Sequence, residues 1–295
     1  MIKLSCPISL DDAELVDAWI YESESSSWEL FRKKVNDPTY LLSGYFTSEE
    51  EARAGWSALH EAFPNITAEP TKEIIEDEDW QDAYKAYLKP WSYQELHWVP
   101  LYQKEDYTLP NGDVCVYVDA GMAFGTGTHE TTQLCAMRLM NFYEQHKADK
   151  DTCQVIDAGC GSGILAISAA KLGFKNIHAF DIDPDAIRVS EENLECNATK
   201  GMISLETAGL DKALKETSAD LLLANIQTHI LKENADVLLK AMKPQGTLIL
   251  SGILLSEQVG VKELFEEKAK TLPGHYSFDS RVLGEWTDVC IQVRS

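Results

Sequence analysis

The sequence predicts an α/β protein: a doubly wound sheet of strands, preceded by a small α+β domain and a helical linker. Two observations predict the sheet. Between Val155 and Leu165, an apolar run ends at an acid, three glycines follow at alternate positions, and an Ala/Leu/Ile-rich segment begins. This change from strand-like to helix-like spacing is typical of a strand, a tight turn and a helix in a parallel sheet. A second apolar run, Ile177 to Asp181, also ends in an acid.

The length predicts two domains. A chain of 295 residues exceeds one typical domain, and its 44% apolar and 25% charged residues are ordinary for a globular protein. We expect a ferredoxin-like domain over residues 1–70, a linker over residues 71–110 and the larger α/β domain over residues 111–295. No run of 18 apolar residues exists, and the start of the chain lacks the apolar stretch of a signal peptide.

The first 70 residues follow the order β-α-β-β-α-β, which suggests a ferredoxin-like domain. The predicted strands cover residues 3–8, 28–31, 40–46 and 66–68, and the predicted helices cover residues 10–21 and 48–63. The second helix has clear end signals, because Ser48 and Glu51 form a capping box at its start and Pro64 ends it.

An acidic, aromatic connector over residues 73–98 joins the two domains. Its residues 79–88 can be helical until Pro90. The aromatic side chains on one face of this helix are expected to pack between the domains: Trp80, Tyr84, Tyr87 and Trp91. A Pro-Asn-Gly-Asp turn at residues 110–113 then precedes a strand over residues 114–118.

The remaining elements alternate between helix and strand, as a doubly wound sheet requires. After the two strands named above, strands are predicted over residues 203–206, 220–226 and 247–251, with a closing hairpin over residues 276–286 and 289–293. Helices are predicted over residues 130–146, 184–197, 228–242 and 256–270. The helix at residue 184 begins with Pro, which suits a first helical turn.

The glycine turn and the acid after the second strand together indicate a nucleoside site. Gly159 and Gly161 leave no Cβ between the backbone and a ligand lying across the turn, and the helix start presents N–H groups to it. Asp181, 18 positions after Gly163, can accept hydrogen bonds from both ribose hydroxyls. The ligand is either a nicotinamide dinucleotide or S-adenosylmethionine. The spacing Asp-x-Gly-x-Gly-x-Gly differs from the dinucleotide pattern Gly-x-Gly-x-x-Gly, so we favour S-adenosylmethionine as the cofactor.

Asn225 is the candidate catalytic residue. It ends the apolar run over residues 220–226, and the carboxyl ends of strands in an open α/β sheet meet in one crevice, so it should face Gly159 and Asp181. Its amide oxygen can accept hydrogen bonds from a bound reactant without adding charge. The alternative is an Asn that only caps the helix starting at Thr228.

Residues 119–132 are expected to form a mobile loop packed against the ligand, because they combine glycines and hydroxyls just before a helix. Phe124 can cover the cofactor there. His129 could act as a general base, but a capping or packing role is the preferred interpretation.

The formal net charge of −22 disfavours a nucleic-acid partner, because it repels phosphate backbones. Residues 1–110 carry 22 Asp/Glu against 9 Lys/Arg, a net charge of −13, while the longer remainder carries −9. Such an acidic front end would steer a basic partner; the alternative is that it only keeps the protein soluble. The seven cysteines include no Cys-x-x-Cys pair, which suits reduced thiols in a cytoplasm and argues against a zinc site, so no metal ligand is expected. Cys160, inside the glycine turn, is expected to be a small buried residue.

With these residues in view, the chain resembles the ribosomal protein L11 methyltransferases. The matching pieces lie between residues 79 and 286: residues 79–80, 123–132, 157–165, 181–184, 224–226, 251–254 and 285–286. The resemblance implies a seven-stranded, Rossmann-like class I methyltransferase domain and a mobile N-terminal domain that presents the substrate. It also implies that a monomer methylates lysine side chains, and the N-terminal amine, of this large-subunit protein. By position, the resemblance places Thr132, Gly159, Asp181 and Asn225 on the cofactor. The chain departs from the family pattern beside the acceptor site, where Gln227-Thr228 replace small apolar residues.

Three other functions stay open. A nicotinamide-dependent oxidoreductase would share the first two strands but has no use for an Asn at the end of a later strand. A binding module would keep the fold and the acidic surface without methyl transfer. A related methyltransferase would modify lysines of another basic protein.

Overall fold

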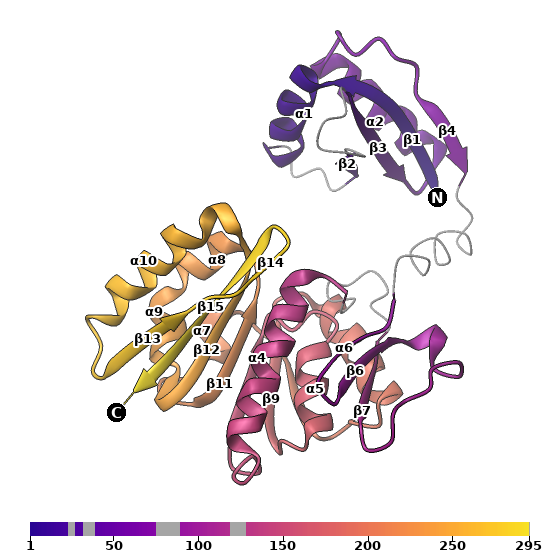
Figure 1. The fold of residues 1–295 in the computed structure, drawn as a ribbon. Helices are drawn as coiled ribbons and strands as arrows, with labels where there is room; N and C mark the ends of the chain where they lie inside the picture. The colour runs from indigo at the N-terminus through magenta and orange to yellow at the C-terminus, as the bar shows by residue number, and fades with distance from the viewer. Residues whose placement is uncertain (23–26, 32–38, 75–88, 119–127, 295) are drawn as a thin grey trace. The chain divides into compact units, whose positions relative to one another are not determined.

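The computed structural model describes residues 1–22, 27–31, 39–74, 89–118 and 128–294. The chain divides into two compact units, Met1–Tyr87 and Leu88–Ser295, and each is described here by itself (Figure 1). Residues 71–110, expected as a linker, supply strands to both units. Within that stretch, residues 75–88, including the whole of the helix expected over residues 79–88, lie outside the described residues.

The first unit has the strand order of a ferredoxin-like domain. Its elements are β1 (Ile2–Ser9), α1 (Leu10–Glu22), β2 (Trp28–Phe31), β3 (Thr39–Phe46), α2 (Glu49–Ala62) and β4 (Thr71–Ile74). The antiparallel sheet has the order β2-β3-β1-β4. Helix α2 starts as predicted, because the Ser48 side chain accepts a hydrogen bond from the Glu51 N–H, while the Glu51 carboxylate reaches back to the N–H of Thr47.

The predicted fourth strand was placed wrongly. Ile66 is buried in the core of the first unit, and its N–H donates to the Phe63 carbonyl, so it belongs to a turn. The strand is Thr71–Ile74, which pairs with residues 2–5 of β1. All four side chains of this edge strand are exposed, so it shows no alternation of apolar and polar residues by which the sequence could reveal it.

The second unit is built on a mixed sheet that has the doubly wound order. Its strands are β8 (Gln154–Ala158), β9 (Asn176–Asp181), β10 (Ile203–Thr207), β11 (Ala219–Asn225), β12 (Met242–Leu254), β13 (His275–Asp279), β14 (Val282–Leu283) and β15 (Trp286–Arg294). The spatial order is β10-β9-β8-β11-β12-β15-β13, with β14 added onto β15. Strands β10 to β12 are parallel, and β15 is antiparallel to both neighbours. The winding direction reverses between β8 and β11, which is where open sheets of this type bind ligands.

Helices cover both faces of this sheet (Figure 1). They are α4 (Glu130–His146), α5 (Ile164–Leu172), α6 (Pro184–Cys196), α7 (Leu210–Ala213), α8 (Thr228–Glu233), α9 (Ala235–Lys240) and α10 (Gln258–Ala269). Alternate residues of the central strands enter opposite cores: Val155 packs in the core with α4, α5 and α6, and Ile156 packs in the core with α8, α9 and α10. The helix predicted over residues 228–242 is split at Asn234, whose side-chain amide bonds back to the Ile230 carbonyl.

A second, three-stranded sheet joins the larger unit through its helices. It contains β5 (Trp91–Tyr93), β6 (Leu96–Pro100) and β7 (Val114–Val118), in that order. Trp98 is buried, stacks on Trp91 at 4.0 Å between ring centroids, and donates its indole N–H to the Ser168 hydroxyl of α5 at 2.8 Å. Trp91 therefore packs within the second unit. Within the described ranges, no helix has the length and apolar composition to cross a membrane.

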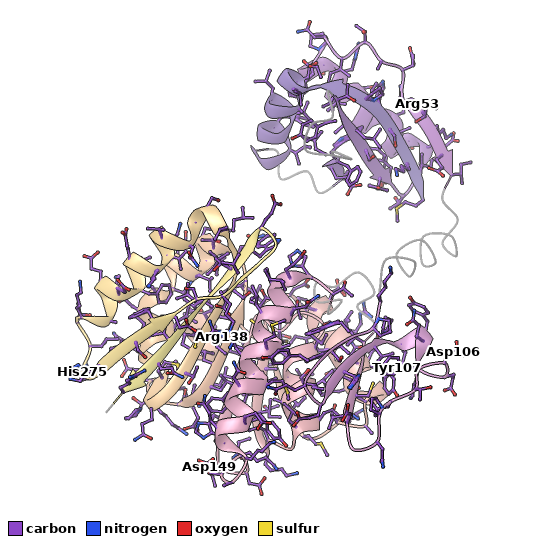
Figure 2. All side chains as sticks on the ribbon, viewed as in Figure 1. Arg53, Asp106, Tyr107, Arg138, Asp149 and His275 are labelled. Carbon is purple, nitrogen blue, oxygen red and sulfur yellow. The ribbon has the colours of Figure 1, made fainter. Side chains whose placement is uncertain are left out.

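A buried ion pair fastens α4 to the last strands of the sheet, and Figure 2 labels Arg138, its member on α4. The Arg138 guanidinium donates to both carboxylate oxygens of Asp288, at 2.7 and 2.8 Å, and to Asp279 at 2.6 Å. Arg138 lowers the pKa of the Asp279 carboxyl below its usual range. Removing one partner of such a buried pair is costly, because the other charge is left without compensation. The middle of α4 is thereby held against the sheet.

Asp157 supports the turn that follows β8. It is buried, and its carboxylate accepts a hydrogen bond from the Ala166 N–H of α5 at 3.0 Å. This bond serves the start of α5, because the N-cap residue Gly163 has no side chain to do so. Burial raises the pKa of Asp157 to about 7.

The raised pKa predicts how Asp157 affects stability. Between its unfolded value of about 3.9 and its folded value of about 7, the folded state holds a proton that the unfolded state lacks. The contribution of Asp157 to the free energy of unfolding therefore falls as the pH rises through this window. Replacing Asp157 with Asn should make the fall of the unfolding free energy with pH less steep, by the slope that corresponds to about one bound proton. Denaturant unfolding from pH 4 to pH 8 tests this, with the exposed Asp106→Asn as control. Equal slopes in all three proteins would contradict the prediction.

Candidate active site

A cavity of about 780 Å³ lies at the carboxyl ends of β8, β9 and β11. Four residues predicted from the sequence line it: Gly159, Gly161, Asp181 and Asn225. The predicted Thr132 is fully buried behind the wall and reaches the cavity through its contact with Asn225. Phe124 lies outside the described residues.

The glycine turn is bonded to the end of the neighbouring strand. The N–H groups of Gly159 and Cys160 both donate to the Phe180 carbonyl, at 2.9 and 3.0 Å. The N–H of Gly161 donates to the Asp181 carboxylate at 2.9 Å. Cys160 is buried, and burial raises the pKa of its thiol, which fits the packing role expected for it. The turn therefore forms a rigid floor that is fixed to the residue predicted to hold a ribose.

Two backbone N–H groups orient the Asp181 carboxylate. One oxygen accepts from Gly161, and the other accepts from the N–H of Asp183 at 3.0 Å. A carboxylate oxygen has two lone-pair sites, so each oxygen keeps one for a ligand. The arrangement suits a diol with two adjacent hydroxyls, as a ribose presents.

Asn225 carries a buried acceptor without a partner. Its side-chain N–H donates weakly to the Thr132 hydroxyl at 3.4 Å, which directs the amide. Its Oδ1 is buried and has no hydrogen-bond partner among the described residues. An unpaired buried polar atom costs about 1–3 kcal/mol, so a donor on a ligand is expected at this point. Asn225 does not cap the following helix, because the N-cap of α8 is Gln227.

Two glycines hold the end of β11 in place. A Cβ on Gly159 would lie 2.3 Å from the side-chain Cγ2 of Ile226. A Cβ on Gly252 would lie 2.3 Å from the carbonyl oxygen of Ile226. Both glycines also have positive φ angles, of 71° and 83°, which a larger residue adopts only with strain. Ile226, beside Asn225, thus packs its side chain on Gly159 and its backbone on Gly252, where a Cβ at either glycine would overlap it.

An aromatic pair forms another wall. His129 is the N-cap of α4, where its Nδ1 accepts from the Thr131 N–H at 3.3 Å, so the predicted capping role is confirmed. The His129 ring lies edge-on to Trp286, with 5.0 Å between ring centroids, and both side chains line the cavity. Sequence reasoning gave Trp286 no function. Its only signal was its place in the matched pair at residues 285–286.

Sequence reasoning also missed the apolar wall near Asp181. Ile182 is 77% exposed, although it is a large apolar residue, and it lines the cavity together with Phe180 and Leu210. An exposed apolar residue directly after the acid is a signal of ligand contact, but only the structure shows its exposure. The two residues of the unusual pair at 227–228 have different surroundings. Gln227 lines the cavity, whereas the Thr228 hydroxyl donates to the Glu257 carboxylate at 2.7 Å.

Comparisons with known proteins agree with this geometry. A family model described as ribosomal protein L11 methyltransferase (PrmA) matches residues 6–291. The protein of that name from Listeria monocytogenes (serotype 1/2a, strain 10403S) is 38% identical over 268 residues, covering 87% of this chain and 82% of the relative. The one from Desulfitobacterium hafniense is 33% identical over 262 residues, covering 85% of this chain and 80% of the relative.

A solved structure supports the same assignment. The crystal structure of a ribosomal protein L11 methylase from Lactobacillus delbrueckii subsp. bulgaricus is similar with a TM-score of 0.58 and 30% identity. The similarity covers 69% of this chain and 97% of that chain. Since a methyltransferase family of this fold uses S-adenosylmethionine as methyl donor, the predicted cofactor is confirmed. The family model and the relatives cover most of the sequence, and the chain belongs to the ribosomal protein L11 methyltransferase family.

Proposed function

We propose that this protein transfers methyl groups from S-adenosylmethionine to amino groups of ribosomal protein L11, on lysine side chains and on the N-terminal amine. The names of the relatives support the choice of substrate protein. The observation that carries the choice of an amine is the buried, unpartnered Oδ1 of Asn225 at the strand end, beside Gly159 and Asp181. An acceptor atom placed there, without a partner among the described residues, can take a hydrogen bond from an amine N–H.

The residues of the cavity fit the cofactor. The Asp181 carboxylate would hold the ribose hydroxyls, and Ile182 and Leu210 would offer apolar surface to the adenine ring. When bound, S-adenosylmethionine supplies a methyl group made electrophilic by its positively charged sulfur. Phe124 remains a predicted cover for the cofactor, since it lies outside the described residues.

The protein must supply a neutral, oriented amine. A lysine amine has a pKa of about 10.4 in water and must lose a proton before it can attack. Desolvation in the cavity favours the neutral form. Asn225 Oδ1 would accept an N–H of that amine and so direct its lone pair, while the Thr132 hydroxyl keeps the amide from turning. Alignment of this kind is a main source of rate in a reaction whose electrophile needs no further activation.

One labelling experiment separates this function from the alternative substrate and from the oxidoreductase. Incubation with methyl-tritiated S-adenosylmethionine and purified L11 should label L11, and mass spectrometry of the product should place the methyl groups on amino groups. Labelling of a different basic protein from a cell lysate, with L11 left unlabelled, would favour the alternative substrate. The pair Gln227-Thr228, which departs from the family pattern beside the acceptor site, would then be the first place to look for the change in specificity. Binding of a nicotinamide dinucleotide without any methyl transfer would favour the oxidoreductase.

Three further expectations belong to the same proposal. We expect the enzyme to act as a monomer, in the cytoplasm where ribosomal proteins are made. We also expect it to contact the substrate protein without binding nucleic acid directly, because the net charge of −22 repels RNA.

Asp181→Ala should weaken S-adenosylmethionine binding by at least about tenfold. Hydrogen bonds to a charged group contribute about 1.5–3 kcal/mol each, and a tenfold change in affinity corresponds to about 1.4 kcal/mol. Titration calorimetry measures the loss. The matched control is Asp183→Ala, which removes a neighbouring carboxylate that caps α6 by accepting from the Asp185 N–H. If both variants lost affinity equally, the ribose role of Asp181 would be wrong.

Asn225→Ala should lower kcat by at least about a hundredfold and weaken cofactor binding much less, since alignment acts on the transition state. Thr132→Val should lower kcat in the same direction by a smaller factor, because it removes the hydroxyl that directs the amide but keeps the buried volume. Thr132→Ser keeps the hydroxyl and is the matched control. Parallel losses of kcat and cofactor affinity in Asn225→Ala would reduce Asn225 to a cofactor contact.

The acidic N-terminal unit is proposed to recruit the basic substrate. Deleting Met1–Tyr87, the whole first unit including β4, should leave the affinity for S-adenosylmethionine near the parent value. Methylation of L11 should collapse. The remaining activity should also depend less on salt, because attraction between exposed charges fades as the Debye length shortens from about 10 Å at 0.1 M to about 3 Å at 1 M. Steady-state rates at several salt concentrations provide the test. A truncated enzyme that methylates L11 like the parent would rule out recruitment.

A further inference from the structure

A cluster of three potential metal ligands lies at the end of α4, outside the cavity described above. It consists of His146, Asp149 and Cys153, and Figure 2 marks Asp149 at the end of this helix. His146 is the last residue of α4, and Cys153 directly precedes β8. One nitrogen, one carboxylate oxygen and one sulfur lie within 4.8 Å of one another.

The turn between α4 and β8 holds the three side chains together. The Asp149 N–H donates to the His146 carbonyl at 3.1 Å, and the Thr152 N–H donates to the Asp149 carbonyl at 2.9 Å. The Cys153 thiol also faces this carbonyl, at 3.6 Å. The His146 Nδ1 lies 3.2 and 3.3 Å from the two carboxylate oxygens of Asp149. The ligand set is therefore arranged by backbone hydrogen bonds before any ion arrives.

The His146–Asp149 separation suits a small tetrahedral site, and the Cys153 sulfur lies within 4.8 Å of both ligand atoms. With metal–ligand bonds of about 2.0–2.3 Å, neighbouring ligand atoms of a Zn²⁺ ion lie about 3.3–3.7 Å apart. The His146 and Asp149 atoms already have this separation. Their side chains are 29% and 59% exposed, so both can adjust, whereas Cys153 is 5% exposed and provides a fixed point.

We propose that His146, Asp149 and Cys153 bind a zinc ion, with water as the fourth ligand. A nitrogen, an oxygen and a sulfur donor together favour Zn²⁺ over Mg²⁺ or Ca²⁺, which prefer oxygen ligands alone. The two lysines of the turn engage other groups. Lys147 pairs with Glu144 at 2.6 Å, and the Lys150 ammonium lies 5.7 Å from the centre of the Tyr143 ring.

Zinc binding requires the Cys153 thiol to release its proton to solvent, because the thiolate is the ligand. Burial, with the charges of Asp149 and Asp220, raises the pKa of this thiol to about 11. Lys243 opposes them, and it pairs with Asp220 at 2.6 Å. The thiol therefore carries its proton near neutral pH in the free protein, and the zinc ion must displace it.

This site departs from the expectation of no metal site, which was based on the missing Cys-x-x-Cys pair. Its spacing, His-x-x-Asp-x-x-x-Cys, matches no common zinc pattern, and the turn brings the ligands together. The ion would join the end of α4 to the start of β8. The opposite ends of these same elements carry Thr132 and Gly159, so the site would stabilise the frame of the active site from its far side.

Cobalt and zinc titrations test the proposal on full-length protein without a histidine tag and freed of metal by a chelator. One Co²⁺ per chain should bind with a thiolate-to-cobalt charge-transfer absorption in the near ultraviolet, and Zn²⁺ should displace it. Zn²⁺ should also raise the Tm of the protein. Cys153→Ala and His146→Gln should each weaken Zn²⁺ binding by at least about tenfold, because loss of a ligand costs at least as much as loss of a supporting residue.

The matched control is Cys196→Ala, which removes another cysteine, on α6, and should bind Zn²⁺ like the parent. Retained S-adenosylmethionine binding shows that each variant is folded. The proposal is overturned if the parent binds no stoichiometric Zn²⁺. It is equally overturned if Cys153→Ala keeps the parent affinity and the charge-transfer absorption, or if Cys196→Ala loses them.

Discussion

The close approach of three strand ends is the constraint on which the site depends. Ile226 lies so tightly between Gly159 and Gly252 that an added methyl group would overlap its side chain at Gly159 and its backbone at Gly252. This contact sets where β11 ends relative to β8 and β12. Asn225 therefore meets the glycine turn and Asp181 at one edge of the sheet. A small displacement of the strand end would separate the orphan amide oxygen from the groups predicted to hold the cofactor, although every residue would still be present.

Helix α4 provides the second fixed reference. Its middle is held by the buried pair of Arg138 with Asp288, and its N-terminal end is held by the Ser251 hydroxyl, which donates to the Thr131 carbonyl at 3.0 Å. The next residue, Thr132, then contacts Asn225. A buried ion pair contributes less to stability than its short distances suggest, because both charges lose their hydration. Its value here is geometric, since it fixes the register of the helix that directs the Asn225 amide.

The sequence predicted those parts of the site that follow from local pattern and the rules of parallel sheets. Gly159, Asp181 and Asn225 each end a strand, and strand ends of such a sheet meet, so their proximity could be inferred without coordinates. Thr132 came from family resemblance, because its contact spans 93 positions in the chain. Trp286 and the exposed Ile182 were beyond reach, since their roles depend on packing and exposure. Strand β4 was missed because it forms by pairing with the distant strand β1, not through a local apolar pattern. The break at Asn234 was missed because a single side-chain hydrogen bond, to the Ile230 carbonyl, accompanies it.

The position of β15 has a consequence for how the protein is made. This strand lies between β12 and β13, although both precede it in the sequence. As the chain leaves the ribosome, the sheet lacks its penultimate strand, between β12 and β13, until residues 286–294 emerge. Two residues of the site frame, Trp286 and the Asp288 partner of Arg138, arrive with that strand. Until then Arg138 has no buried counter-charge from β15, and the aromatic wall is incomplete. The frame of the site can therefore be completed only after residues 286–294 have been synthesised, and a nascent chain that stalls before them holds an unfinished site.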